Sequence, residues 1–441
     1  MSVFLLFSWI NLKAGTTWAR AYGKNKRESA NSVAVTTDGG FVVAGWTQSF
    51  GKGNSDFWVI KLDAHGNIIW EKTYGKRGRE KANCIIQTKD GGFIVAGETT
   101  SYPRYLINIW VLKLDNHGNV VWQKSYGGPG NEIPDSIIQT ADGGYLISGT
   151  IHRLNTGRFK HRDFLLIKID KNGRVQWQKA YGGKGDEEGH AVVQTSDGGF
   201  AVVGRSTSFS KDWGDFWVLK TDKMGNPQWE MAYGGPYDDR PYGLLQTSDG
   251  GYLVTGHSQS FGERPRDTNA WLLKLDRQGN VLWQISYGNR RMNKAFRAVE
   301  TGDGGYAVVG ISDPDYMASP DLWIFKIDRA GNLKWSKTYG GDFWESGYSI
   351  KEAPDGGLVA VGYSETAFKV HVKHVFVVKT DGNGNLKGCS APLVHPLKVN
   401  ASKTNAIIKR TSIKPDKIKL TVLNTNVKAL PSQAEVKNMC H

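Results

Sequence analysis

The sequence predicts an all-β protein: a seven-bladed β-propeller with four antiparallel strands in each blade, closed by a strand from the N-terminal part of the chain. A set of short motifs recurs seven times along the 441 residues, at spacings of 52 to 55 residues. Each copy holds four runs rich in β-branched and aromatic residues, which turn-forming residues separate. Four strands per unit in seven successive units are typical of propeller blades.

Four markers keep step with one another along residues 17–388. They are an Asp-Gly-Gly tripeptide, a Trp, a Tyr-Gly pair four residues after that Trp, and a Lys-x-Asp tripeptide. Independent markers in one phase exclude a chance repeat. The tripeptides begin at Asp38, Asp90, Asp142, Asp197, Asp249, Asp303 and Asp355. The Trp residues are Trp18, Trp70, Trp122, Trp177, Trp229, Trp283 and Trp335.

The second copy shows the order of elements in one unit. Residues 84–88 form a short β-branched strand, and an Asp-Gly-Gly turn follows, in which glycine supplies a positive φ. Residues 93–97 form the second strand, and a longer loop leads to the third strand at 109–115. The turn at 116–119 then connects to the fourth strand at 120–126. No segment shows a helical period over more than a turn or two.

Loop lengths predict how the strands connect. The two short turns of each unit join neighbouring antiparallel strands, whereas the segment after Tyr-Gly must cross from one blade to the next. This crossing and the long loop before the third strand should share one face of the disc, where lengths vary. The chain starts with a lone fourth strand at 17–22 and ends with a third strand at 375–381. We therefore expect the N-terminal strand to complete the seventh blade, which removes free sheet edges.

The two ends of the chain differ from the repeats. Residues 1–16 are an apolar lead-in or the remnant of a signal peptide, too short to span a bilayer. No other segment is a transmembrane candidate. Residues 390–441 form a basic tail with nine Lys or Arg against Asp416 and Glu435, and the whole chain has a net charge of +14. The tail alternates apolar and polar residues in places, which predicts either added strands or a tether.

The three cysteines have different surroundings in the sequence. Cys84 stands inside a repeat where other copies have small residues, so we predict a small buried core residue. Cys389 closes the last repeat and Cys440 is the penultimate residue. A disulfide between these two would pin the tail to the body and would imply an oxidising compartment. Two free thiols are the alternative.

The motifs resemble two kinds of known repeat. The run Leu-Lys-Leu-Asp-Asn-His-Gly-Asn-Val-Val-Trp122 is similar to the tryptophan-docking repeat of quinoprotein-type propellers, in which the Trp packs between adjacent blades. The whole unit more closely resembles a family of secreted bacterial and archaeal repeat proteins, as in residues 229–233 and 246–252. That resemblance implies a propeller outside the cytoplasm and no particular activity. The Thr of the docking motif is missing, so no quinone and no other cofactor is expected.

Residues that recur in every unit favour structural roles. The seven Trp should belong to the core, and the Asp that opens each hairpin turn should cap the turn backbone. Residues 381–385 superficially resemble a calcium loop but lack its distal acidic residue, so no metal is predicted. A carboxylate follows Tyr-Gly in six of the seven copies, with Asn293 in the other, and we expect it to cap loops because a catalytic pair needs two different environments. These carboxylates are Glu28, Glu80, Glu132, Glu187, Asp239 and Glu345.

The variable loops supply the candidate ligand site. Four loops share Gly-x-[Ser/Thr]-x-Ser-[Phe/Tyr], and arginines accompany them on the same face. Aromatic rings interleaved with hydroxyls and guanidinium groups suit sugar rings, anionic glycans or a protein partner. Packing of these loops against the neighbouring blade is the alternative. The candidate residues are Phe50, Tyr102, Arg104, Arg158, Arg162, Phe209, Phe261, Arg264, Arg290 and Arg291.

The sequence favours a non-catalytic propeller, secreted or on the cell surface, that acts as a binding or scaffold protein for glycan or protein. It contains no nucleophile elbow, zinc-protease motif or phosphate loop, and no catalytic residue is predicted. The alternative is a polysaccharide-active hydrolase or lyase built from loops, which would need clustered carboxylates or a Tyr/His/Arg group in a cleft. Nucleic acid fits poorly because the basic excess lies largely in the tail. A monomer is expected.

Overall fold

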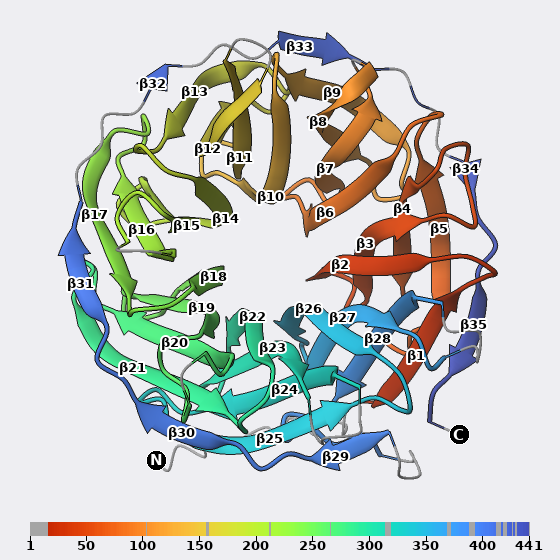
Figure 1. Cartoon of the computed structure of the whole chain (residues 1–441). Coiled ribbons are helices and arrows are strands. Elements are labelled where there is room, and N and C mark those ends of the chain that lie inside the picture. The colour runs from red at the N-terminus through yellow and green to blue at the C-terminus, as the bar shows by residue number, and fades with distance from the viewer. Residues whose placement is uncertain are drawn as a thin grey trace, which may run out of the picture.

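The computed structural model describes residues 16–102, 104–155, 158–210, 213–264, 266–313, 319–367, 372–387, 393–411, 416–417, 421–425, 427 and 430–440. These residues form strands and no helix. Seven sheets stand around a central axis as the blades of a propeller (Figure 1). The predicted fold class is therefore confirmed. The apolar run at residues 1–15 lies outside the described residues.

Each blade has four antiparallel strands that follow one another outward from the axis. The innermost strands are β2 (Glu28–Val35), β6 (Glu80–Gln87), β10 (Asn131–Gln139), β14 (Glu187–Gln194), β18 (Asp239–Gln246), β22 (Asn293–Glu300) and β26 (Glu345–Glu352). The second strands are β3 (Phe41–Thr47), β7 (Phe93–Ser101), β11 (Tyr145–Asn155), β15 (Phe200–Ser206), β19 (Tyr252–Ser258), β23 (Tyr306–Ser312) and β27 (Leu358–Ser364). We number the blades 1 to 7 in this order.

The third and fourth strands complete the blades. The third strands are β4 (Asp56–Leu62), β8 (Arg104–Leu114), β12 (Arg158–Ile169), β16 (Asp215–Thr221), β20 (Asn269–Leu275), β24 (Asp321–Ile327) and β28 (His374–Thr380). The fourth strands are β5 (Ile68–Tyr74), β9 (Val120–Gly127), β13 (Val175–Tyr181), β17 (Pro227–Gly234), β21 (Val281–Gly288), β25 (Leu333–Tyr339) and, for blade 7, β1 (Trp18–Gly23). Strand β1 pairs with β28 from Trp18↔Lys379 to Tyr22↔Val375, so the predicted closure by the N-terminal strand is confirmed.

Two of the sequence markers form one ion pair in every blade. Asp38 opens the Asp-Gly-Gly turn, and the Lys61 Nζ of the third strand lies 2.9 Å from its Oδ1. Gly39 in this turn has φ of +80°, as the turn requires. The Asp of Lys-x-Asp caps the next turn, since Asp63 Oδ1 accepts hydrogen bonds from the backbone N–H of His65 and Asn67, both at 2.8 Å. The predicted capping role is confirmed.

The other two markers join neighbouring blades. The Tyr22 hydroxyl donates to the backbone carbonyl of Gly66 at 2.7 Å, and the Trp18 indole N–H donates to that of Ala64 at 3.0 Å. The indole ring covers Gly66, where an added Cβ would lie 2.9 Å from ring atoms. Trp18 is buried, but its six counterparts are only half-buried. These Trp therefore lie at the blade junctions, and the fully buried ones are third-strand residues such as Trp58 and Trp110.

The glycine of each Tyr-Gly pair makes room for buried polar side chains, which are acidic at most of the blade junctions. A Cβ on Gly340 would lie 2.0 Å from Asp321 Oδ1 and 2.7 Å from Glu345 Oε2. Asp321 starts the third strand of blade 6 and Glu345 starts the innermost strand of blade 7, and both are buried. The two carboxyl groups therefore meet at the junction only because position 340 has no side chain.

We expect Gly340→Ala to lower the free energy of unfolding by about 1–3 kcal/mol, because the new methyl group would overlap two buried carboxyl groups. Denaturant unfolding monitored by Trp fluorescence would measure the change. Gly302→Ala is a matched control, since the nearest atom to its added Cβ is 3.8 Å away. Equal stabilities of the two variants would contradict this account of the Tyr-Gly marker.

The basic tail adds a fifth strand to every blade, and we call its strands the belt. The belt runs around the outside of the disc against the order of the blades, from blade 6 through blade 1 to blade 7 (Figure 1). This confirms the expectation of added strands. The belt strands are β29 (Val394–Pro396), β30 (Asn400–Lys403), β31 (Ile407–Arg410), β32 (Asp416–Lys417), β33 (Thr421–Asn424), β34 (Leu430–Pro431) and β35 (Glu435–Asn438).

Hydroxyl groups at intervals of seven residues tie the belt to buried indoles. The indole N–H of Trp271 donates to Thr404 Oγ1 at 3.0 Å, and that of Trp110 donates to Thr425 Oγ1 at the same distance. Trp217 and Trp58 bond in the same way to Thr411 and Ser432. The belt therefore advances seven residues for each blade. Near its end, Cys440 is disulfide-bonded; Cys389 lies outside the described residues.

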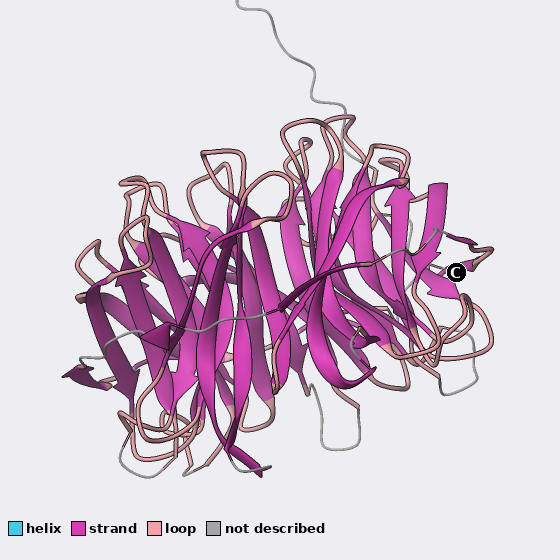
Figure 2. Cartoon of the chain, turned by 90° about the horizontal axis from the view of Figure 1, so that it is seen from above, coloured by secondary structure: helices cyan, strands magenta, loops and turns pink. Residues whose placement is uncertain are grey.

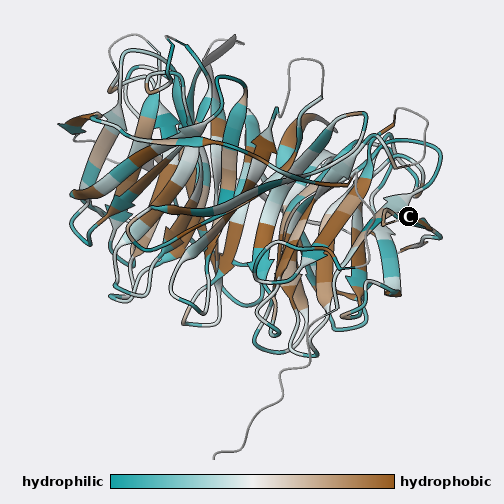
Figure 3. Cartoon of the chain, turned by 90° about the horizontal axis from the view of Figure 1, so that it is seen from below, coloured by the Kyte–Doolittle hydropathy of each residue, from teal (hydrophilic) through white to brown (hydrophobic). Residues whose placement is uncertain are grey.

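The strands cross the thickness of the disc, and loops cover its two faces (Figure 2). Apolar residues concentrate in the strands and hydrophilic ones in the loops (Figure 3). The crossing segments and the loops before the third strands lie on one face, which we call the crossing face. Among the described residues there is no helix long and apolar enough to cross a membrane.

Candidate functional site

A β-bulge occurs at the same place in all seven innermost strands. In β2 the pairing with β3 skips one residue between Ala30 and Ser32, and the other innermost strands show the same shift. An extra residue in one strand of a pair re-aims its side chain. The seven bulged residues line one cavity of about 250 Å³ on the axis. They are Asn31, Asn83, Asp135, His190, Tyr242, Phe296 and Tyr348.

The ring divides into two arcs of different chemistry, although the blades share one framework. Blades 5 to 7 contribute Tyr242, Phe296 and Tyr348, which we call the aromatic arc. The ring centroids of Tyr242 and Phe296 lie 4.9 Å apart, and those of Phe296 and Tyr348 lie 5.4 Å apart. Blades 1 to 4 contribute two amides, a carboxylate and an imidazole. This cavity, which we call the mouth, therefore offers an apolar side and a hydrogen-bonding side to one ligand.

The mouth adjoins a second cavity, which we call the channel. The channel has a volume of about 220 Å³ and is lined by residues of all seven innermost strands. The two cavities share Asn31, Asn83, Asp135 and Arg297 in their walls, so the mouth opens into the channel. Cys84 also lines the channel and is half-buried. The prediction that Cys84 is a buried core residue is wrong, because this position of the innermost strand faces the axis.

A second variable position places further rings next to the aromatic arc. The residue after the Gly of each second strand differs between blades, and in blades 5 and 7 it is His257 and Tyr363. The His257 ring stacks on Tyr242 with centroids 5.5 Å apart, and Tyr363 lies 6.0 Å from Tyr348. The Lys373 ammonium lies 3.9 Å from the Tyr363 ring centroid. Rings from two layers of strands therefore form one continuous aromatic cluster, in which the buried His257 and Tyr363 support the rings that line the mouth.

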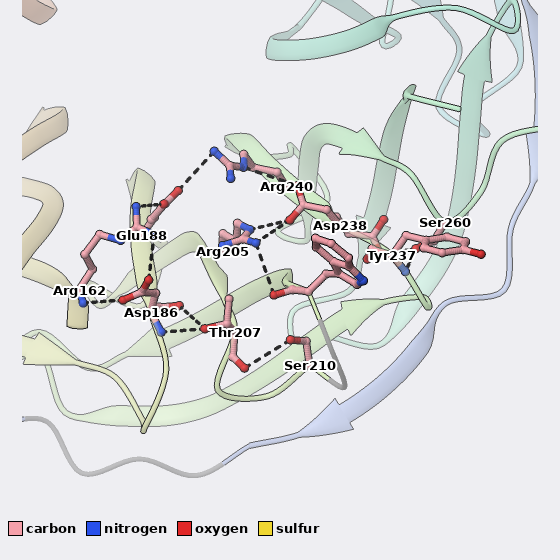
Figure 4. A network of polar contacts seen from close by, with 12 residues as sticks. Arg162, Asp186, Glu188, Arg205, Thr207, Ser210, Tyr237, Asp238, Arg240 and Ser260 are labelled. Carbon is pink, nitrogen blue, oxygen red and sulfur yellow. Dashed lines mark hydrogen bonds and ion pairs between the residues drawn. The ribbon is translucent and has the colours of Figure 1, made fainter. Parts of the chain in front are cut away.

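Charged groups at the edge of the mouth in blades 3 to 5 are paired with one another. Glu188 lies between two guanidinium groups: it forms an ion pair with Arg162, and Arg240 Nη1 lies 3.6 Å from its Oε2 (Figure 4). Arg205 Nη2 lies 2.6 Å from Asp238 Oδ1, again within the network of Figure 4. This network links three adjacent blades and leaves little net charge at this edge.

Two titratable rings of the aromatic cluster, Tyr242 and His257, do not suit the role of a general base. Burial raises the pKa of Tyr242 well above its usual value, so its phenol stays protonated. Burial and the nearby Lys294, Arg240 and Arg205 hold the pKa of His257 well below its usual range. A general base at neutral pH needs a pKa near 7, and neither group has one. No group of three or more metal-binding side chains occurs in the described part of the chain.

The four predicted loop aromatics lie around the rim and do not gather at one site. Each packs on the buried Trp of its own third strand: Phe50 on Trp58 with ring centroids 5.6 Å apart, and Phe209 on Trp217 at the same distance. Tyr102 and Phe261 pack likewise on Trp110 and Trp271. Each loop therefore packs within its own blade, and not against the neighbouring blade as in the alternative given by the sequence.

The predicted arginines are also dispersed. Arg162 reaches the network at the mouth, whereas Arg264 is exposed. Arg290 forms an ion pair with Glu263, and Arg291 Nη1 lies 3.5 Å from Asp313 Oδ2. Phe261 and Arg290 line a small cavity of about 70 Å³ together with Asn400 of the belt. The backbones of Arg104 and Arg158 belong to β8 and β12, and their side chains lie outside the description.

The residues of the mouth were not predicted from the sequence, because the prediction used the positions that have the same residue in most of the repeats. In each copy the residue three positions after the recurring carboxylate or Asn varies from amide to acid, imidazole and aromatic ring. A position that varies within a strict repeat takes no part in the contacts that all blades share. Alignment of the seven copies and inspection of the unlike positions would have found the ring.

Comparisons with known proteins add little to this picture. No family model matches the chain, and no curated protein matches it. Among solved structures, the chain is similar to Sqt1 from Chaetomium thermophilum, with 12% identity, 78% of this chain and 81% of that chain covered, and a TM-score of 0.45. It is also similar to polysaccharide lyase Uly1, with 8% identity, 85% and 94% covered, and a TM-score of 0.49. The resemblance to secreted repeat proteins stays a prediction.

Proposed function

We propose that the protein is a non-catalytic binding protein that recognises a glycan at the mouth of its central channel on the crossing face. One observation carries the proposal: seven equivalent bulges aim side chains of five kinds at one cavity, with the aromatic arc facing amides and a carboxylate. The C–H face of a sugar ring stacks on aromatic side chains, and its hydroxyl groups need polar partners. The two halves of the ring supply these two kinds of contact.

The mouth favours binding over catalysis. The active site of a polysaccharide lyase or hydrolase at the mouth would use Tyr242, His190 or His257, the Tyr and His side chains that lie near the arginines. The phenol of Tyr242 is held protonated, and the Nδ1 of His257 is buried without a hydrogen-bond partner. An enzyme remains the second candidate because His190 lies between acids, with Nδ1 4.0 Å from Asp135 Oδ1 and Nε2 3.8 Å from Glu188 Oε2.

A binding screen tests the proposal and separates the mouth from the rim. The purified chain would be titrated with neutral and anionic polysaccharides at low salt and at about 0.5 M salt, where surface charge is largely screened. We expect binding that persists at high salt and falls about tenfold in Phe296→Ala, because a stacking ring is lost. Phe209→Ala, a rim variant, should bind as the wild type does. Loss of binding in Phe209→Ala alone would move the site to the rim.

We also propose that the protein works outside the cytoplasm, at the cell surface or secreted. The disulfide at Cys440 supports this location because disulfides persist in oxidising compartments. A protein partner on the crossing face is the outcome to pursue if no polysaccharide binds. Release of unsaturated oligosaccharides during the screen, followed by absorbance near 235 nm, would establish the lyase alternative instead.

A further inference from the structure

Two cations stand in the channel beneath the aromatic arc. Arg297 follows the bulged residue of blade 6 and lines both cavities, and Lys351 of blade 7 lines the channel. Cys84 and Asp135 line the same channel from blades 2 and 3, and Asp135 is the only carboxylate among the residues that line either cavity. The channel wall therefore has an excess of positive charge under the aromatic side of the mouth.

These cations differ from those at the edge of the mouth. Arg162, Arg205 and Arg240 all have carboxylates within 4.0 Å. The side chains of Arg297 and Lys351 have no hydrogen bond or ion pair with any described residue. Burial lowers the pKa of both groups, while the charge of Asp135 acts in the opposite direction on Arg297. Arg297 is half-buried and Lys351 is exposed in the channel, so an anion that enters the channel can reach both charges.

We infer that the channel beneath the aromatic arc binds the carboxylate or sulfate group of an anionic saccharide through Arg297 and Lys351. This inference rests on the proposed glycan binding and names the ligand class. A sugar ring on Tyr242, Phe296 and Tyr348 would lie above Arg297, which belongs to the walls of both cavities. A guanidinium group binds a carboxylate or a sulfate with two parallel hydrogen bonds, and an ammonium group adds a point charge.

The test compares two probes that differ only in charge, tetragalacturonate and its methyl ester, by titration calorimetry. We expect the wild type to bind the acid about tenfold more tightly, as a charge-assisted contact implies. In Arg297→Gln/Lys351→Gln this preference should fall to less than about twofold. Lys334→Gln removes a similar charge from an outer strand and should keep the full preference. Equal affinity of the wild type for both probes would overturn the inference and leave the proposed function intact.

Failure of both probes to bind would count against the glycan proposal, and inorganic sulfate would then decide the anion site separately. Sodium sulfate would be titrated at constant ionic strength while the melting temperature is recorded. A saturable rise in the wild type that is absent from Arg297→Gln/Lys351→Gln supports the site. The same response in both proteins overturns it.

Discussion

Deletion of the belt, residues 393–441, is expected to lower the free energy of unfolding by about 5 kcal/mol. Leu393, Val399 and Val427 are buried against the blades, and each fully buried aliphatic side chain contributes about 1.5–3 kcal/mol. The deletion also exposes the outer edge strand of every blade, and unpaired edges promote association between chains. Thermal unfolding and light scattering would measure the two effects, a lower melting temperature and larger particles.

The charge of the belt is not expected to matter for this stability. Lys398 and Lys403 are exposed, so Lys398→Gln/Lys403→Gln should leave the melting temperature within about 1 °C of the wild type. Val399→Asp/Val427→Asp keeps the length of the belt and should reproduce most of the loss. If the charge variant were destabilised and the apolar variant were not, the belt would be held by electrostatics, contrary to the contacts described.

The second large effect concerns pH. We expect the protein to lose stability as the pH rises from 6.5 to 8.5. Burial raises the pKa of Asp321 to about 8 and that of Asp215 to about 7, and a neighbouring carboxylate adds to each shift. Burial raises the pKa of Glu132 to about 7 as well. The folded protein thus holds protons that the unfolded chain, with carboxyl pKa values near 4, has already released.

The sign and size of the effect follow from this difference in bound protons. Where the folded state holds more protons, stability falls with rising pH by about 1.4 kcal/mol per pH unit for each extra proton. His257 acts in the opposite sense, because its lowered pKa favours the folded state as the pH rises toward 6.5. Above pH 6.5 the buried carboxyl groups dominate. Urea unfolding at four values of pH in this window would give the slope.

The protein contains the control for this prediction. The junction between blades 5 and 6 has Asn269 and Asn293 in place of the two acids. Asp321→Asn copies that arrangement, and we expect a shallower slope and a more stable protein at pH 8. Asp342→Asn changes an exposed acid near the same junction and should keep the wild-type slope. An unchanged slope in Asp321→Asn would show that the junction acids hold no extra proton.

The architecture was predictable because its markers are interactions within and between blades. The Lys61–Asp38 pair and the Tyr22 hydroxyl bond recur in every unit, so their residues recur in the sequence. The belt was harder to predict, since its strands are only two to four residues long and show no sustained alternation. The hydroxyl residues Thr404, Thr411, Thr425 and Ser432 are seven or fourteen residues apart, and this spacing has meaning only beside the third-strand tryptophans.

The candidate site was not predictable from loop composition. The sequence does not show whether an aromatic residue in a loop is exposed or packs on a buried Trp. Phe50, for example, packs on Trp58. The bulge that turns Tyr242 and Phe296 toward the axis depends on pairing between strands. The sequence does contain one signal of the site. At a single position of an otherwise regular repeat, three residues after the recurring carboxylate or Asn, the residue differs between blades.

The belt also dictates an order of events in folding. Its contacts join residues far apart in the chain: Ser432 meets Trp58 across 374 residues, and Thr404 meets Trp271 across 133. Six of the seven blades, by contrast, form from neighbours within about one repeat, and only blade 7 needs the distant pairing of β1 with β28. Since distant pairings form slowly, blades should assemble first during synthesis and the belt should wrap a finished disc. A belt added last contributes little to the folding transition state and much to the barrier against unfolding, so the completed protein should open slowly even when its equilibrium stability is modest.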